Sequence, residues 1–242
     1  MVDNTDKFKI NYKSIISIDL EKLKLQYKDD ADDKENEYNP FKVNSFQNYV
    51  PIYNNFFNME ESNYNDICLN NKRQIIDLET LENSGTIEKK EIFIKYSPLL
   101  DPIKYMVGKY DISDNSIRTL PNLKNKEDCH KKLLEMNNSS YVDGFFCFLS
   151  GMLLNTYNSK NFIDFYGSFL TVQDKFKINV SDDFDYLGDS NYFSDHLNKL
   201  FSVSRFDLYK QYLNYSRTNR NKLNISSEEL EEFGPDFISL DE

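Results

Sequence analysis

Lys95 is the residue whose place in the sequence comes nearest to predicting a chemical function. It closes the run Lys89-Lys-Glu-Ile-Phe-Ile-Lys95, whose alternation of apolar with charged residues is typical of a β-strand with one buried face. The run follows a turn signal at Asn83-Ser84-Gly85. A lysine at the end of such a strand can reach the phosphates of a bound nucleotide, so we predict Lys95 as a nucleotide-binding residue.

A phosphate-binding lysine of this kind is held by a carboxylate, and the predicted central helix offers one, Asp143. Asp143 is one methylene shorter than the usual Glu and precedes Gly144, which weakens a helix. We therefore favour a role for Asp143 at the positive end of the helix dipole, with pairing to Lys95 as the alternative. Alternation also puts Phe93 on the face of Lys95, where it would fill the space of an adenine ring.

The other motifs give no catalytic and no metal-binding residue. No Gly-x-Gly-x-x-Gly precedes the first strand, so the phosphate-binding loop is missing. Cys129 and His130 are neighbours in sequence rather than a nucleophile with its base. Residues 182–188 have acids two apart but lack the bidentate glutamate of a calcium loop, so we expect a solvated connector. Glu232-Phe233-Gly234 is close to the metal-binding Asp-Phe-Gly motif, but no catalytic loop comes before it.

Composition limits the partners. The net charge of -11 repels phosphate backbones, so nucleic acid is not expected as the main partner. A protein partner is expected instead. The one basic aromatic patch, interleaved with tyrosines, fits the face of a solvated helix, with RNA or an acidic partner as the alternative; it consists of Lys210, Arg217, Arg220 and Lys222. No apolar stretch is long enough to span a bilayer, and no secretory signal is visible. Three scattered cysteines indicate a reducing compartment, so we expect a cytosolic protein.

The predicted elements give an α+β fold, a small antiparallel sheet with a packed central helix. Residues 74–81 and 87–96 are predicted as the strands of a hairpin, with a tight turn at 82–85. The central helix is predicted over Asn137 to Asn155, capped by Asn138, Ser139 or Ser140, and it is apolar on most sides.

Three regions are expected along the chain. Residues 1–45 read as a flexible charged arm, in which residues 15–25 could form a short amphipathic helix. Residues 46–195 form the α+β domain, which includes a second predicted hairpin with strands 162–172 and 176–180. Residues 196–242 are expected to be a helical and acidic extension, with the helix over 196–215.

Three segments resemble divergent kinase-like proteins of large nucleocytoplasmic DNA viruses, namely residues 92–110, 141–146 (Tyr-Val-Asp-Gly-Phe-Phe) and 164–170 (Asp-Phe-Tyr-Gly-Ser-Phe-Leu). The similarity covers roughly residues 73 to 200 and implies the small lobe of a protein kinase, with Lys95 as the strand lysine. In that family the small lobe precedes a catalytic half with a His-x-Asp loop. This sequence contains no His-x-Asp, and we expect it to stop before that half.

The resemblance therefore implies a viral pseudokinase-like small lobe without catalytic motifs, acting as a binding or regulatory module or as the N-terminal part of a split kinase-like protein. One alternative is an active phosphotransferase completed by a separate large lobe, and only then are ATP and magnesium expected as cofactors. Another alternative is a structural virion or scaffold protein. The resemblance implies the host cytoplasm or virus factory as the location, with the virion as an alternative.

Overall fold

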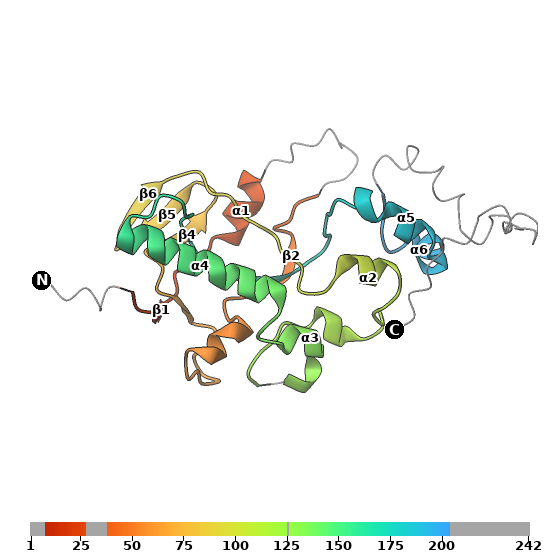
Figure 1. Ribbon diagram of the computed structural model, residues 1–242, viewed down its shortest axis with the longest axis horizontal. Helices are drawn as coiled ribbons and strands as arrows, with labels where there is room; N and C mark the ends of the chain where they lie inside the picture. Colours follow the sequence, from red (N-terminus) through yellow and green to blue (C-terminus); the bar gives the residue numbers. More distant parts are fainter. Residues whose placement is uncertain (1–7, 28–37, 125, 204–242) are drawn as a thin grey trace, which may run out of the picture. The chain divides into compact units, whose positions relative to one another are not determined.

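The computed structural model describes residues 8–27, 38–124 and 126–203 of the 242-residue chain. Contacts divide the chain into two compact units, Met1–Asn179 and Val180–Glu242. The larger unit combines short antiparallel strands with helices, so the predicted α+β class is confirmed (Figure 1). The boundary between the units falls at 179/180, earlier in the chain than the predicted 195/196.

The sheet that precedes Lys95 is a three-stranded antiparallel meander. Its strands, in spatial order, are β4 (Arg73–Asp77), β5 (Thr80–Asn83) and β6 (Thr86–Lys89). The predicted turn before β6 is confirmed: Ser84 and Gly85 both have positive φ, 50° and 88°, the pattern of a two-residue type I′ hairpin. The single strand predicted over 74–81 is wrong, because a second turn at residues 78–79 divides it.

The predicted returning strand, 87–96, is shorter than expected, because β6 ends at Lys89. The chain stays extended for a few residues, since Lys90 N donates to Glu79 O at 2.8 Å and Ile92 N donates to Leu78 O at 3.0 Å. The chain that pairs with this segment turns away at residues 78–79. Residues 93–98 therefore form no strand. Lys95 therefore lies on an extended segment beyond the sheet.

Two smaller antiparallel pairs use residues from the predicted N-terminal arm. They join β1 (Tyr12–Ser14) to β3 (Ile67–Leu69) and β2 (Val43–Gln47) to β7 (Leu170–Gln173). Helix α1 (Leu20–Gln26) lies within the predicted arm too, capped by the Asp19 carboxylate, and its Leu23 is fully buried. The short helix predicted over 15–25 is therefore present in part, beginning at Leu20, whereas the strand residues 12–14 and 43–45 were not expected in a flexible arm. Strands of three to five residues are too short to show a clear alternation of apolar and polar residues, and their partners lie far away in the sequence.

Helix α4 (Ser139–Tyr157) is the predicted central helix, and its predicted cap is confirmed. Asn138 Oδ1 accepts from Ser140 N at 3.1 Å, while its Nδ2 donates to Leu99 O at 2.9 Å. The helix ends at Tyr157, and the next residue, Asn158, is left-handed with φ 53°. The core around α4 and the 3₁₀ turn η1 (Pro51–Asn55) comprises Val50, Ile52, Tyr53, Leu69, Tyr141, Phe148, Phe165 and Leu170.

The predicted second hairpin, with strands 162–172 and 176–180, is wrong. Only β7 forms, and it pairs with β2 rather than with residues 176–180. Residues 164–168 instead run between β4 and α4: Ile75 N donates to Tyr166 O at 3.0 Å, and the rings of Phe165 and Phe148 meet edge to face at 5.9 Å. Residues 164–168, which were expected to belong to a hairpin, thus connect the meander to helix α4.

Short helical segments complete the larger unit. They are α2 (Pro102–Met106), η2 (Asn115–Arg118), η3 (Lys126–Asp128) and α3 (Lys131–Leu134). Asp101, Asp114 and His130 cap α2, η2 and α3 with their side chains. None of the helices in the described ranges is both long and apolar enough to cross a membrane.

The smaller unit contains η4 (Ser181–Asp183), α5 (Phe184–Gly188) and α6 (Asn191–His196). The Phe193 ring stacks on Phe201, with centroids 5.1 Å apart. The helix predicted over 196–215 does not form over 197–203, where Leu197 and Phe201 make an isolated bridge. The rest of that prediction lies outside the described residues.

Asp77, at the end of β4, is a fully buried carboxylate that holds α1 against the meander. It accepts hydrogen bonds from Lys22 Nζ, from Thr80 Oγ1, from Gln26 Nε2 at 3.2 Å and from Glu79 N at 2.8 Å. Burial opposes its ionisation, but these donors outweigh burial, and the pKa of Asp77 lies well below its usual range. The bond from Glu79 N also closes the turn that divides the predicted strand.

Replacing Asp77 by Asn should lower the free energy of unfolding at pH 7 by about 2 kcal/mol, because the buried donors lose their ionised acceptor. Because the pKa of Asp77 is lowered in the folded state, its contribution to the free energy of unfolding is complete above about pH 4. This contribution is lost as pH falls toward the folded-state pKa. Urea unfolding should therefore show a smaller gap between wild type and Asp77→Asn at pH 3 than at pH 7. Exposed Glu79→Gln is the control, and an equal gap at both pH values would contradict the prediction.

Candidate functional site on helix α4

Lys95 and Asp143 form an ion pair, with Nζ 2.6 Å from Oδ2. The pairing predicted as the alternative for Asp143 is therefore present in the structure. Donation to Asp143 raises the pKa of Lys95, which keeps the amine charged. The side chains remain 59% and 43% exposed, and a pair so close to water contributes only about 0–1 kcal/mol to stability.

Two serine contacts place the extended segment beside α4. Ser97 Oγ lies 2.9 Å from Ser140 Oγ, and Ser140 Oγ donates to Pro98 O at 2.8 Å. Because Ser97 meets Ser140 in the first turn while Lys95 meets Asp143 further along, the segment runs antiparallel to the helix. The position of the lysine thus depends on the helix start, which the Asn138 cap fixes.

The predicted alternation of residues 92–95 is confirmed, although the segment is not a strand. Ile92 and Ile94 are half-buried, whereas Phe93 is 88% exposed on the same side as Lys95. Phe93 therefore projects into solvent and does not fill an enclosed space next to the lysine. The predicted arrangement, in which Phe93 fills the space of an adenine ring, is therefore not present.

A cavity of about 450 Å³ opens at the N-terminal end of α4, between residues 97–101 and 132–140. Ser97, Asp101, Lys132, Glu135 and Ser139 are among its lining residues, so the wall carries both charge signs. Lys95 and Phe93 do not line it. The cavity and the predicted nucleotide-binding lysine are thus neighbouring features rather than one site.

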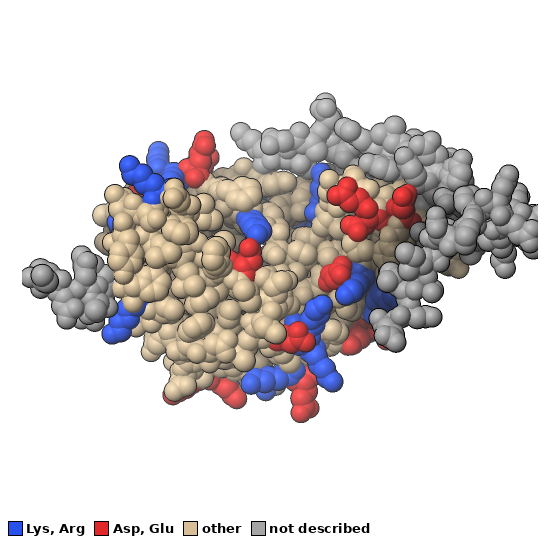
Figure 2. All heavy atoms as spheres, in the orientation of Figure 1, with Lys and Arg blue, Asp and Glu red and all other residues tan. Residues whose placement is uncertain are grey.

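The surface of α4 around the ion pair is apolar. Val142 and Phe146 are 47% and 63% exposed, and Tyr157 continues the same side of the helix toward its C-terminal end. Figure 2 shows that charged side chains are sparse over α4, although the chain carries a net charge of -11. This combination suits contact with another apolar surface better than the binding of a charged small molecule.

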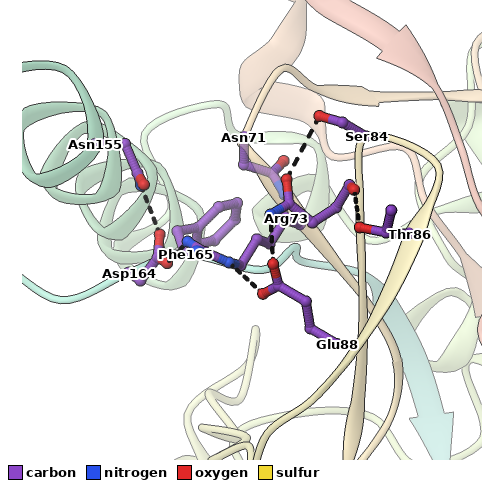
Figure 3. Close-up of polar contacts among 9 residues, drawn as sticks. Asn71, Arg73, Ser84, Thr86, Glu88, Asn155, Asp164 and Phe165 are labelled. Carbon is purple, nitrogen blue, oxygen red and sulfur yellow. Dashed lines mark hydrogen bonds and ion pairs between the residues drawn. The ribbon is translucent and has the colours of Figure 1, made fainter.

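Arg73 links the meander to α4 through a polar network that the sequence did not reveal (Figure 3). Its Nε donates to Glu88 on β6 at 2.8 Å, and its Nη1 donates to Asp164 at 2.9 Å. Asp164 also accepts from Asn155 Nδ2, on α4, at 2.7 Å. Asp164 belongs to a segment quoted for the kinase resemblance, but no local pattern indicates that its partner lies 91 residues away.

The cysteines are not activated nucleophiles. Burial raises the thiol pKa of Cys68 and Cys129 to about 11, and it also raises that of Cys147, which lies near Asp143. His130 Nδ1 accepts from Lys132 N at 3.2 Å as the cap of α3, so it is occupied in a structural role. Within the ranges described, no three His, Cys, Asp or Glu side chains are grouped so as to hold a metal ion.

Two of the remaining sequence motifs lie outside the described residues, namely Glu232-Phe233-Gly234 and the basic aromatic patch at 209–222. Residues 182–188, expected as a solvated connector, form the end of η4 and helix α5 instead.

The fold and the site define this chain as an α+β protein with small antiparallel sheets and a paired lysine and aspartate on the open side of its central helix. No family model, no curated protein and no solved structure matches it.

Replacing Arg73 by Met should lower the free energy of unfolding by about 2 kcal/mol, because Asp164, only 9% exposed, would lose its cation. Chemical denaturation measures the loss, and Lys72→Met, at the exposed neighbouring position, is the matched control. The double variant with Asp164→Asn should cost less than the two single losses combined. Equal effects of Arg73→Met and Lys72→Met would contradict this assignment.

Proposed function

We propose that this chain is a kinase-like small lobe that works as a binding or regulatory module and does not transfer phosphate by itself. The Lys95–Asp143 ion pair carries the proposal. In protein kinases a strand lysine pairs with a carboxylate on the central helix. Here a three-stranded meander, a lysine beyond its last strand and a helix with the paired acid follow in the same order.

The surroundings of Lys95 support binding rather than catalysis. A lysine that is 59% exposed interacts with phosphate in high dielectric, where each ionic contact is weak. The sequence has neither a Gly-x-Gly phosphate loop nor a His-x-Asp catalytic loop, so the groups that hold the nucleotide and position the nucleophile would have to come from elsewhere. The open apolar surface over α4 is suited to a protein partner.

The second candidate is a phosphotransferase completed by a separate large lobe, and the same ion pair favours it. The pair is part of the active arrangement in kinases, and Lys95 and Asp143 form it here. The two candidates differ in whether this chain binds nucleotide. The viral origin and the location in host cytoplasm or virus factory follow from the resemblance of residues 92–110, 141–146 and 164–170 and belong to the same proposal.

Thermal unfolding in ATP and magnesium separates the two candidates. Under the leading proposal we expect the melting temperature to stay unchanged up to about 5 mM nucleotide, because a ligand stabilises a protein only above its dissociation constant. Lys95→Met should then behave like wild type. A rise in wild type that disappears in Lys95→Met but persists in the control Lys89→Met, at an exposed lysine of β6, would overturn the leading proposal in favour of the phosphotransferase.

A further inference from the structure

Helix α4 is apolar nearly all round, but the larger unit covers only part of its circumference. Tyr141, Phe148 and Gly151 are buried against the core. Val142, Phe146, Leu149, Leu153 and Tyr157 lie within about 80° of one another around the helix and form an uncovered or partly covered stripe. A helix of this composition normally lies inside a core, so the stripe needs a cover.

Phe93 widens the stripe on one side. The extended segment runs antiparallel to α4, with Lys95 level with Asp143. Two residues of extended chain span about as much length as one helical turn, so Phe93 lies about level with Phe146. Phe93 and Phe146 are the most exposed phenylalanines in the described part of the chain, at 88% and 63%. We call Phe93, Lys95, Asp143 and the stripe residues of α4 the α4 face.

Electrostatics limits what can cover the α4 face. Two copies that each carry a net charge of -11 repel one another, and residues 28–37 and 204–242 hold most of that excess charge. The α4 face carries one cation and one anion side by side, Lys95 and Asp143, so its own charges cancel. It is also the area where Figure 2 shows few charged side chains. Contact here would bring few like charges into direct opposition.

We propose that two copies of this chain associate through their α4 faces about a twofold axis. In an isologous interface every contact occurs twice, so a twofold axis that passes beside the ion pair brings Lys95 of each copy to Asp143 of the other. The patch is thus complementary to itself in charge, and its aromatic side chains pack against apolar side chains of the other copy. A second copy needs no chemistry beyond what the chain already has. This proposal does not depend on the kinase resemblance.

The dimensions agree with such a contact. A standard interface buries about 800 Å² on each partner, which corresponds to a round patch about 32 Å across. Helix α4, with 19 residues, is about 28 Å long. Exposed aromatic residues at the centre of a patch are the side chains that contribute most to binding.

Sedimentation velocity on the full chain, from about 1 to 100 μM, tests the association. We expect a concentration-dependent species of twice the 28.7 kDa monomer mass. Phe146→Ser should weaken dimerisation about tenfold or more. Ile87→Ser on β6 is the matched control, because Ile87 is also 63% exposed but lies outside the α4 face, and it should leave the dissociation constant unchanged. A wild-type chain that is monomeric throughout this range would overturn the proposal.

A charge exchange tests the geometry. Lys95→Glu or Asp143→Lys alone places like charges opposite each other in a homodimer and should weaken it about tenfold or more. An equimolar mixture of the two variants pairs Glu with Lys and Asp with Lys across the axis, and its dissociation constant should return to within about threefold of wild type. Circular dichroism confirms that each variant is folded. If the mixture associates no better than either variant alone, the twofold pairing is wrong.

Discussion

Gly151 lies where helix α4 meets the segment 164–168, and the rest of the larger unit depends on this close contact. A Cβ at this position would lie 2.9 Å from Phe165 N and 3.0 Å from Phe165 Cβ, so a larger residue would push the helix and the segment apart. The same segment bonds to Ile75 of β4 on its other side. Helix and meander therefore pack on opposite sides of one shared spacer segment.

The polar contacts around this spacer give it a fixed orientation that apolar packing alone would not. Asp164 accepts from Arg73 on β4 and from Asn155 on α4, and these directional bonds hold one register of the segment between sheet and helix. Arg73 also reaches Glu88 on β6, so the far strand is joined to the same network. The network thus joins the meander that precedes Lys95 to α4, and the serine contacts at Ser97 and Pro98 then hold the lysine segment beside the helix.

The parts of the fold that could be predicted from sequence are those specified within a few residues. Asn138 caps α4 by bonding to Ser140, and the turn at Ser84 and Gly85 needs only its own backbone angles. The arrangement of β2 with β7 could not be predicted, because each strand shows a short and ambiguous pattern that only its distant partner resolves. The second hairpin was predicted wrongly for the same reason: alternation at 176–180 indicates a strand but does not indicate whether a partner is present.

The candidate site shows the same division between local and distant information. The alternation that puts Phe93 and Lys95 on one side follows from the sequence of the segment alone, and it is present in the structure. Whether that side faces a cavity or solvent depends on where β6 ends, and the turn at 78–79 ends the sheet before Lys95 is reached.

An enclosed nucleotide site would need walls around the lysine, which strengthen ionic contacts by excluding water. On an open face the same lysine is better suited to contact with a protein surface. Such a surface would exclude the water that weakens the Lys95–Asp143 pair. Partial exposure of this pair is thus a feature that favours association with a protein over binding of a small anion.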